Sequence, residues 1–128
     1  MVEVAAGPVD VEVAMRLSDE IPLHAIVTND SLAELDLKPG RRALALVKAS
    51  FVEISAADAP ALYERNRFVG KVTRRIDDRR RSEVLLDIGG GKSLTAVISL
   101  AKAEALGLGE GSPAAAHFAP ENVILAIA

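Results

Sequence analysis

Apolar and polar residues alternate near the start of the chain. Between residues 9 and 17 apolar side chains (three valines, then Met15 and Leu17) alternate with the charged Asp10, Glu12 and Arg16, and a second apolar arm follows at 21–27 after a polar turn. A period of two places the apolar side chains on one face of a half-buried strand. The two segments therefore predict a β-hairpin.

A short helix and two buried strands are predicted next. Residues 28–40 carry leucines on one face, begin with the hydroxyl of Thr28 and end at Pro39-Gly40. A hydroxyl before an apolar face and a Pro-Gly after it are the usual signals for the start and the end of a helix. Residues 43–47 and 51–54 are apolar runs short enough to be strands.

The same order of elements returns 71 residues later, since residues 11–54 overlay 82–125 without a gap. An ungapped register over 44 positions favours a tandem duplication over a chance likeness of two strand–helix–strand units. We therefore divide the chain into a first repeat at 1–55, a connector at 56–62 and a second repeat at 63–128. The identical residues lie on alternate strand positions, on the helix face and at the helix end: Glu12/Glu83, Val13/Val84, Leu23/Leu94, Ala25/Ala96, Leu35/Leu106, Leu37/Leu108, Gly40/Gly111, Ala43/Ala114, Ala45/Ala116 and Val52/Val123.

Composition narrows the class of protein. Half of the residues are hydrophobic and 26% are charged, which is typical of a folded globular chain. No apolar run approaches the roughly 18–20 residues that cross a bilayer, and no export signal is visible, so we expect a cytoplasmic protein without a membrane partner. The net charge of −3 and the aromatic content of 3% argue against nucleic acid as a partner of this chain. The absence of cysteine excludes thiolate metal sites and cysteine nucleophiles.

Four segments resemble a known family. Residues 7–13, 45–50, 87–98 and 106–111, read in that order, resemble the molbindin or Mop domain, a small OB-like β-barrel that binds molybdate and tungstate. Two copies in tandem resemble the cytoplasmic molybdate-storage proteins and the C-terminal domain of molybdate-dependent transcription regulators. The resemblance implies a mostly β fold of two tandem OB-like barrels of the Mop/TOBE type, each with one short helix.

The sequence departs from the family pattern in three places. A Mop repeat opens with an arm reading Ser-Ala-Arg-Asn, whereas residues 63–66 read Tyr-Glu-Arg-Asn and the first repeat has no arm. Ala119 stands where the first repeat has Lys48. A second copy altered in this way resembles the regulators more than the storage proteins. A missing arm leaves a sheet edge short, so we predict a homo-oligomer in which another subunit covers it; alternatively, the chain is part of a longer regulator.

A tetrahedral dianion needs convergent N–H and O–H donors and a positive field. Thr28 and Ser31 supply hydroxyls at the start of the first helix, where backbone N–H groups are also unpaired. By resemblance these two residues, together with Lys48, Ala49 and Ser50, match the oxyanion-binding positions of the family. The alternative is that Thr28 only caps the helix and that Lys48 is only a solvated strand end.

Three further positions complete the predicted site residues. Arg65 matches the arm arginine, which in the family reaches a pocket of a neighbouring repeat or subunit, and Asn66 matches the residue after it. Ser99 retains the helix cap in the second repeat, but Lys102 replaces the equivalent of Ser31 and Ala119 removes the strand cation. We therefore expect a weak or absent site in the second repeat.

Other clusters are interpreted more simply. Residues 89–93 read Gly-Gly-Gly-Lys-Ser, but Leu86 stands where a phosphate loop needs glycine, so they predict a hairpin turn. The arginines at 74–81 indicate an exposed hairpin loop, with contact to nucleic acid or an acidic partner as the alternative. His24 and His117 lie in apolar strands and lack the spacing of metal ligands.

We expect intracellular binding of molybdate or tungstate, for storage and homeostasis or as the effector-sensing domain of a regulator. The oxyanion would be held by hydrogen bonds, without a direct side-chain ligand to the metal and without an organic cofactor. No catalytic constellation is present, so enzyme activity is not expected. Three alternatives remain: an accessory domain of a molybdate transporter ATPase, an oligonucleotide-binding barrel, and a structural oligomerisation barrel.

Overall fold

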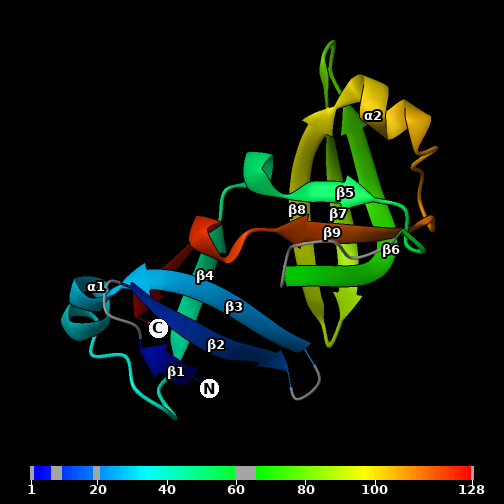
Figure 1. The fold of residues 1–128 in the computed structure, drawn as a ribbon. Coiled ribbons are helices and arrows are strands. Elements are labelled where there is room, and N and C mark those ends of the chain that lie inside the picture. The colour runs from blue at the N-terminus through cyan, green and yellow to red at the C-terminus, as the bar shows by residue number, and fades with distance from the viewer. Residues whose placement is uncertain (1, 7–9, 19–20, 60–65, 128) are drawn as a thin grey trace. The chain divides into compact units, whose positions relative to one another are not determined.

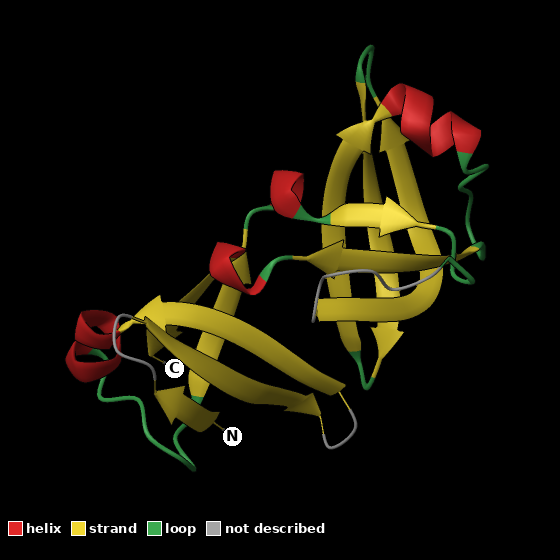
Figure 2. Ribbon diagram, in the orientation of Figure 1, coloured by secondary structure: helices red, strands yellow, loops and turns green. Residues whose placement is uncertain are grey.

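The computed structural model describes residues 2–6, 10–18, 21–59 and 66–127. The fold is mostly β with two short α-helices, as the sequence predicts (Figures 1 and 2). The chain divides into two compact units: the first unit holds residues 1–47 and 119–128, and the second unit holds residues 48–118. Among the described residues, no helix has the length and apolarity to cross a membrane.

The first unit contains an antiparallel sheet in the order β1-β2-β3 and a second antiparallel pair, β4 with β10. The hairpin predicted from the alternation is confirmed, because Val13 on β2 is opposite Ala25 on β3 and both are fully buried. The elements are β1 (Val2–Ala6), β2 (Asp10–Ser18), β3 (Ile21–Thr28), α1 (Asn29–Glu34), β4 (Ala43–Val47), the 3-10 turn η2 (Pro120–Asn122) and β10 (Val123–Ile127).

The second unit is a five-stranded antiparallel sheet in the order β5-β9-β6-β7-β8. Strand β5 also contacts β8, so the two ends of the sheet meet and close it into a barrel. The core includes Phe118, whose ring centroid lies 5.8 Å from that of Phe68. The elements are the 3-10 turn η1 (Ala49–Phe51), β5 (Glu53–Ser55), β6 (Asn66–Asp77), β7 (Arg81–Gly89), β8 (Lys92–Ser99), α2 (Leu100–Ala105) and β9 (Pro113–Phe118).

The two repeats exchange their last strands. Strand β5 belongs to the first repeat in sequence but pairs with β9 of the second unit, while β10 belongs to the second repeat and pairs with β4 of the first unit. Ile54 and Leu125, which are equivalent in the repeat alignment, are 0% and 6% exposed. The repeats at 1–55 and 63–128 therefore describe the duplication in sequence, whereas each compact unit contains strands from both repeats.

The charged segment at 74–81 differs from the expected loop. Strand β6 continues to Asp77 and β7 begins at Arg81, so only a tight turn remains between them. The pairing of Ile76 with Glu83 and of Asp77 with Ser82 extends the ladder through the charged residues. The glycine-rich turn is confirmed, because Gly89, Gly90 and Gly91 all have positive φ between β7 and β8.

Gly70 lies where β6 leaves β9 and joins β7, since Lys71 pairs with both neighbours. A Cβ at Gly70 would overlap the backbone carbonyl oxygen of Asp87. We therefore expect Gly70→Ala to lower the free energy of unfolding by roughly 1–3 kcal/mol, as overpacking does, when measured by urea denaturation. Gly109→Ala is the control, because its Cβ would meet only the Ser112 Oγ, at 3.9 Å. Equal losses in the two variants would contradict the steric explanation.

Candidate functional site

Both α-helices begin at a hydroxyl cap. The Oγ1 of Thr28 accepts a hydrogen bond from the Ser31 backbone N–H at 3.1 Å and donates one to the Ser31 Oγ at 3.0 Å. The Oγ of Ser99 accepts from the Lys102 backbone N–H at 3.2 Å. Thr28 therefore caps the N-terminus of α1, and Ser99 caps the N-terminus of α2 in the second unit.

Lys48, Ala49 and Ser50 lie in the second unit. They lead from β4 into η1, which packs against β8, the strand that ends at Ser99. Within the described residues, no acceptor is found for the backbone N–H groups of Ala49 and Ser50, as expected at the start of a helical turn. The Lys48 Nζ lies 5.8 Å from the ring centroid of Phe51. This segment therefore brings a cation and two N–H donors to the unit that contains Ser99.

The structure does not place Lys48 in the same unit as Thr28 and Ser31, although the repeat pattern led us to group them. Thr28 and Ser31 lie in the first unit, and the strand exchange carries Lys48 into the second. The sequence could not show this, because the repeat alignment does not specify which barrel receives the last strand. The exchange instead combines Lys48, Ala49 and Ser50 of the first repeat with Ser99 of the second.

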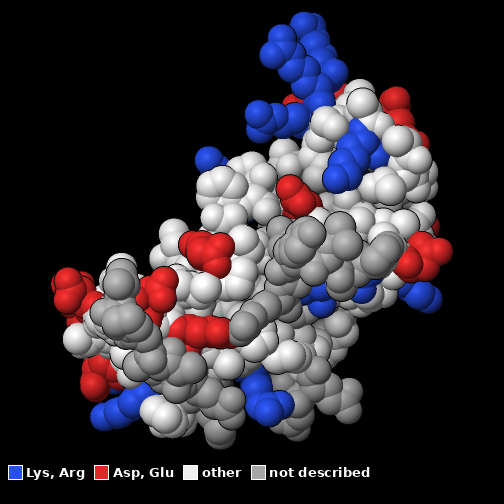
Figure 3. Space-filling model, in the orientation of Figure 1, with Lys and Arg blue, Asp and Glu red and all other residues white. Residues whose placement is uncertain are grey.

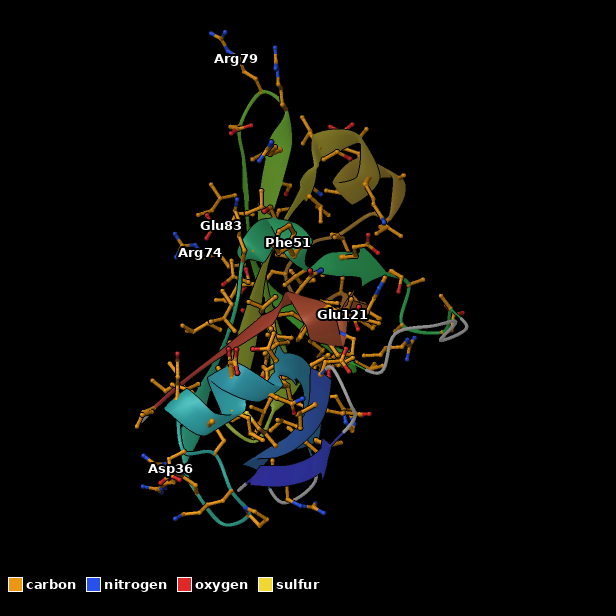
Figure 4. All side chains as sticks on the ribbon, turned by 60° about the vertical axis from the view of Figure 1, so that its left-hand side comes forward. Asp36, Phe51, Arg74, Arg79, Glu83 and Glu121 are labelled. Carbon is orange, nitrogen blue, oxygen red and sulfur yellow. The ribbon has the colours of Figure 1, made fainter. Side chains whose placement is uncertain are left out.

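The corresponding segment of the first unit is poor in donors for an anion. Ala119, Pro120 and Glu121 occupy the positions of Lys48, Ala49 and Ser50, and η2 packs against β3. The Ala119 side chain carries no charge and Pro120 has no backbone N–H to donate. The exposed Glu121, labelled in Figure 4, adds a negative charge. The first unit is therefore the less favourable place for an oxyanion.

Asn66 begins β6, pairs with Phe118 and is fully buried in the second unit. Arg65 lies outside the described residues. Of the predicted site residues, the second unit thus holds Lys48, Ala49, Ser50, Asn66 and Ser99.

The formal charge is divided unevenly between the units. The first unit has four Lys and Arg against nine Asp and Glu, and the second has eleven against nine, which gives −5 and +2 and together the −3 of the whole chain. Figure 3 shows Lys and Arg gathered over the end of the β6–β7 hairpin. The unit that contains Lys48 is therefore also the more attractive one for an anion.

Two aspartates of that hairpin are hydrogen-bonded within it. The Asp77 carboxylate accepts from the Arg75 Nε at 2.9 Å and from the Ser82 Oγ at 2.6 Å. The Asp78 Oδ1 accepts from the backbone N–H groups of Arg80 and Arg81, at 2.8 Å each. The hydrogen bond from the Arg75 side chain is the main cause that lowers the pKa of Asp77. The hydrogen bond from the Arg80 backbone is the main cause that lowers the pKa of Asp78. The two carboxylates therefore stay ionised while they hold the turn.

Two other features of the second unit and of the described chain bear on where an oxyanion could bind. A hollow of about 360 Å³ between residues 55–58 and Leu106, Leu108 and Pro113 has, among the described residues that line it, a carboxylate, Asp58, and no cation. In the described part of the chain, His, Cys, Asp and Glu do not gather in groups of three or more that could hold a metal ion. The described lining of the hollow is therefore less suited to a dianion than the segment at Lys48, Ala49 and Ser50.

Comparison with known proteins agrees with the tandem arrangement. The model of the family described as TOBE domain matches residues 2–54 and again 64–125. The chain is 43% identical over 125 residues to the molybdenum-pterin-binding protein MopA of Rhodobacter capsulatus, a match that covers 97% of this chain and 47% of MopA. It is 36% identical over 121 residues to the molybdenum transport protein ModE of Azotobacter vinelandii, covering 94% of this chain and 45% of ModE. The chain thus spans about half the length of these relatives.

The whole fold also has a solved counterpart. The structure of the cytoplasmic molybdate-binding protein ModG, in a form with molybdate bound, matches with a TM-score of 0.93 at 31% identity, over 98% of this chain and 89% of that one. These relatives are binding and transport proteins rather than enzymes. The expected fold of two tandem barrels is therefore confirmed. With both repeats matched by the same family model, the chain belongs to the TOBE domain family as a tandem pair.

Proposed function

We propose that this chain binds molybdate or tungstate, and that the site lies in the second unit. The observation that carries the proposal is the strand exchange, which brings Lys48, Ala49 and Ser50 to the barrel whose β8 ends at Ser99. The molybdate-binding ModG, similar over nearly the whole chain, and the molybdenum-pterin-binding MopA support the choice of ligand.

The proposed donors suit a tetrahedral dianion. Lys48 supplies a charge, the N–H groups of Ala49 and Ser50 supply backbone donors, and hydrogen bonds to a charged group are stronger than those between neutral groups. Ser99 brings a hydroxyl, and Lys102, exposed on the same helix turn, adds a second cation. The corresponding positions of the first unit include Glu121, so we propose one strong site for each chain, in the second unit.

We also propose that copies of the chain assemble into a homo-oligomer. In the second unit β9 is flanked by β5 and β6, whereas among the described residues β4 of the first unit pairs with β10 alone. Leu44 and Leu46 on β4 are 51% and 53% exposed. Ala115, the equivalent of Leu44 in the second unit, is fully buried. An unpaired edge with exposed leucines favours pairing with another chain. The arm residues Arg65 and Asn66 would then contribute to sites at repeat or subunit interfaces.

The biological role that fits is intracellular molybdenum storage and homeostasis, or effector sensing in a larger regulator. ModG is a cytoplasmic protein, and the relatives include a transport protein, ModE, of which this chain spans less than half. Both roles need the same reversible oxyanion binding, so the binding step is the one to test.

Isothermal titration calorimetry with molybdate, tungstate and sulfate tests the proposal. We expect saturable binding of molybdate and tungstate at one strong site for each chain, with no binding of sulfate. Light scattering on the same samples should give a mass above that of the 13.5 kDa chain. An absence of heat together with an unchanged melting temperature in excess molybdate would contradict the binding proposal.

A further inference from the structure

The β6–β7 hairpin ends in three consecutive arginines, Arg79, Arg80 and Arg81. We propose that Arg79 and Arg80 form a cationic tip that strengthens the binding of a small dianion to the second unit through its electrostatic field, without contacting the ligand. This inference rests on the proposed oxyanion binding. It assigns a role to the arginine cluster, which the predicted site residues leave out.

The backbone of the tip is fixed beside the proposed site. The Asp78 backbone N–H donates to the Arg81 carbonyl oxygen at 2.9 Å, which closes the turn, and the Asp78 carboxylate holds the N–H groups of Arg80 and Arg81. The Arg80 carbonyl oxygen accepts from the backbone N–H of Leu100 at 2.8 Å. Leu100 directly follows Ser99, so this hydrogen bond ties the tip to the start of α2.

The arginine side chains of the tip remain free to act on a distant anion. Asp77 is hydrogen-bonded to Arg75 and Ser82, and Asp78 to the backbone of the turn. Among the described residues, the side chains of Arg79 and Arg80 form no salt bridge, and Figure 4 shows Arg79 pointing away from the barrel. Residues 74–81 carry five arginines against two aspartates, a formal charge of +3.

A local field of this kind matters for an acidic protein. The net charge of −3 opposes the approach of a dianion, whereas the hairpin adds positive charge beside Ser99, which pairs with Arg81. Screening acts over about 10 Å at 0.1 M salt, so the effect should be large at low ionic strength and small at high ionic strength. The tip has no aromatic residue on which a base could stack, so a small anion suits it better than single-stranded nucleic acid.

The test compares molybdate affinity in the double variant Arg79→Gln/Arg80→Gln and in the unchanged protein, by calorimetry at 20 mM and 500 mM ionic strength. At low salt we expect the variant to bind roughly 3- to 10-fold more weakly, near the lower limit of known steering effects. At high salt the two affinities should converge. The matched control is Lys71→Gln/Lys92→Gln, which removes two exposed charges near the opposite end of β7 in the same unit.

Three outcomes would overturn the inference. Equal affinity of the variant and the unchanged protein at low salt would show that the tip exerts no effect. An equal loss at both salt concentrations would indicate a short-range contact or a structural defect, and an equal loss in the Lys71/Lys92 control would indicate net charge alone. If the unchanged protein itself does not bind molybdate, the proposed function fails as well, so the two failures are distinguishable.

Discussion

Replacing Lys48 by alanine is expected to weaken molybdate binding by roughly 10- to 100-fold, the equivalent of the approximately 1.5–3 kcal/mol that a hydrogen bond to a charged group contributes. Lys48 is exposed and leads into η1, so its loss should leave the barrel intact. The affinity is measured by calorimetric titration, and circular dichroism verifies that the fold is unchanged. The control for charge is Lys92→Ala, which removes an exposed lysine at the start of β8 and should leave binding normal.

A matched pair of helix caps tests in which unit the site lies. Thr28→Ala and Ser99→Ala each remove the cap of a six-residue helix and should each cost about 1 kcal/mol of stability. Only Ser99→Ala should also weaken molybdate binding, because Lys48 lies in the unit of Ser99. Normal binding by the Lys48→Ala protein, or a loss confined to Thr28→Ala, would refute the proposed site.

Most of the local structure could be predicted from the sequence because it depends on neighbouring residues. The alternation before Thr28, the hydroxyl caps and the glycines at 89–91 each determine a strand, a helix start or a turn within a few residues. The charged segment at 74–81 was harder to predict. Cross-strand pairing, such as that of Asp77 with Ser82, extends the strands to Asp77 and from Arg81, although the composition of the segment is typical of a loop.

The strand exchange could not be predicted, because the two repeats are alike. Ile54 and Leu125 occupy equivalent positions, and both are buried, so the hydrophobic pattern is satisfied whichever barrel receives each strand. Nothing in the periodicity of residues 51–54 distinguishes a partner in the same repeat from one in the other. For the same reason the sequence could suggest candidate residues for the site, but not which of them share a barrel.

The exchange also explains why the changes in the second repeat need not abolish binding. Ala119 was expected to weaken the second repeat's site, but it lies in the first unit, with Glu121 and Thr28. Lys48 and Ser50, which favour an anion, lie with Ser99 and Lys102. One unit thus combines the favourable residues and the other the unfavourable ones, which is why one strong site for each chain is expected.

Ile54→Ala is expected to destabilise the second unit by roughly 2–5 kcal/mol, because it removes a fully buried side chain and leaves a cavity. Although Ile54 belongs to the first repeat in sequence, it pairs with Ala116 on β9. Native-state hydrogen exchange should therefore show the largest loss of amide protection in β6 to β9. Leu125→Ala is the matched variant, and its loss should fall in β2, β3 and β4 of the first unit.

A disulfide measures the same exchange directly, since the chain contains no cysteine. Glu53 and His117 are opposite each other on β5 and β9, so the variant Glu53→Cys/His117→Cys should form an intramolecular disulfide on oxidation. Without the exchange Glu53 would lie opposite Leu46, because Ile124, the equivalent of Glu53 in the second repeat, pairs with Leu46. A disulfide formed readily by Glu53→Cys/Leu46→Cys but not by the first pair, with Ile54→Ala weakening β2 and β3, would show that each repeat keeps its own last strand. Lys48 would then lie with Thr28 and Ser31 after all, and the oxyanion site would have to be sought in the first unit.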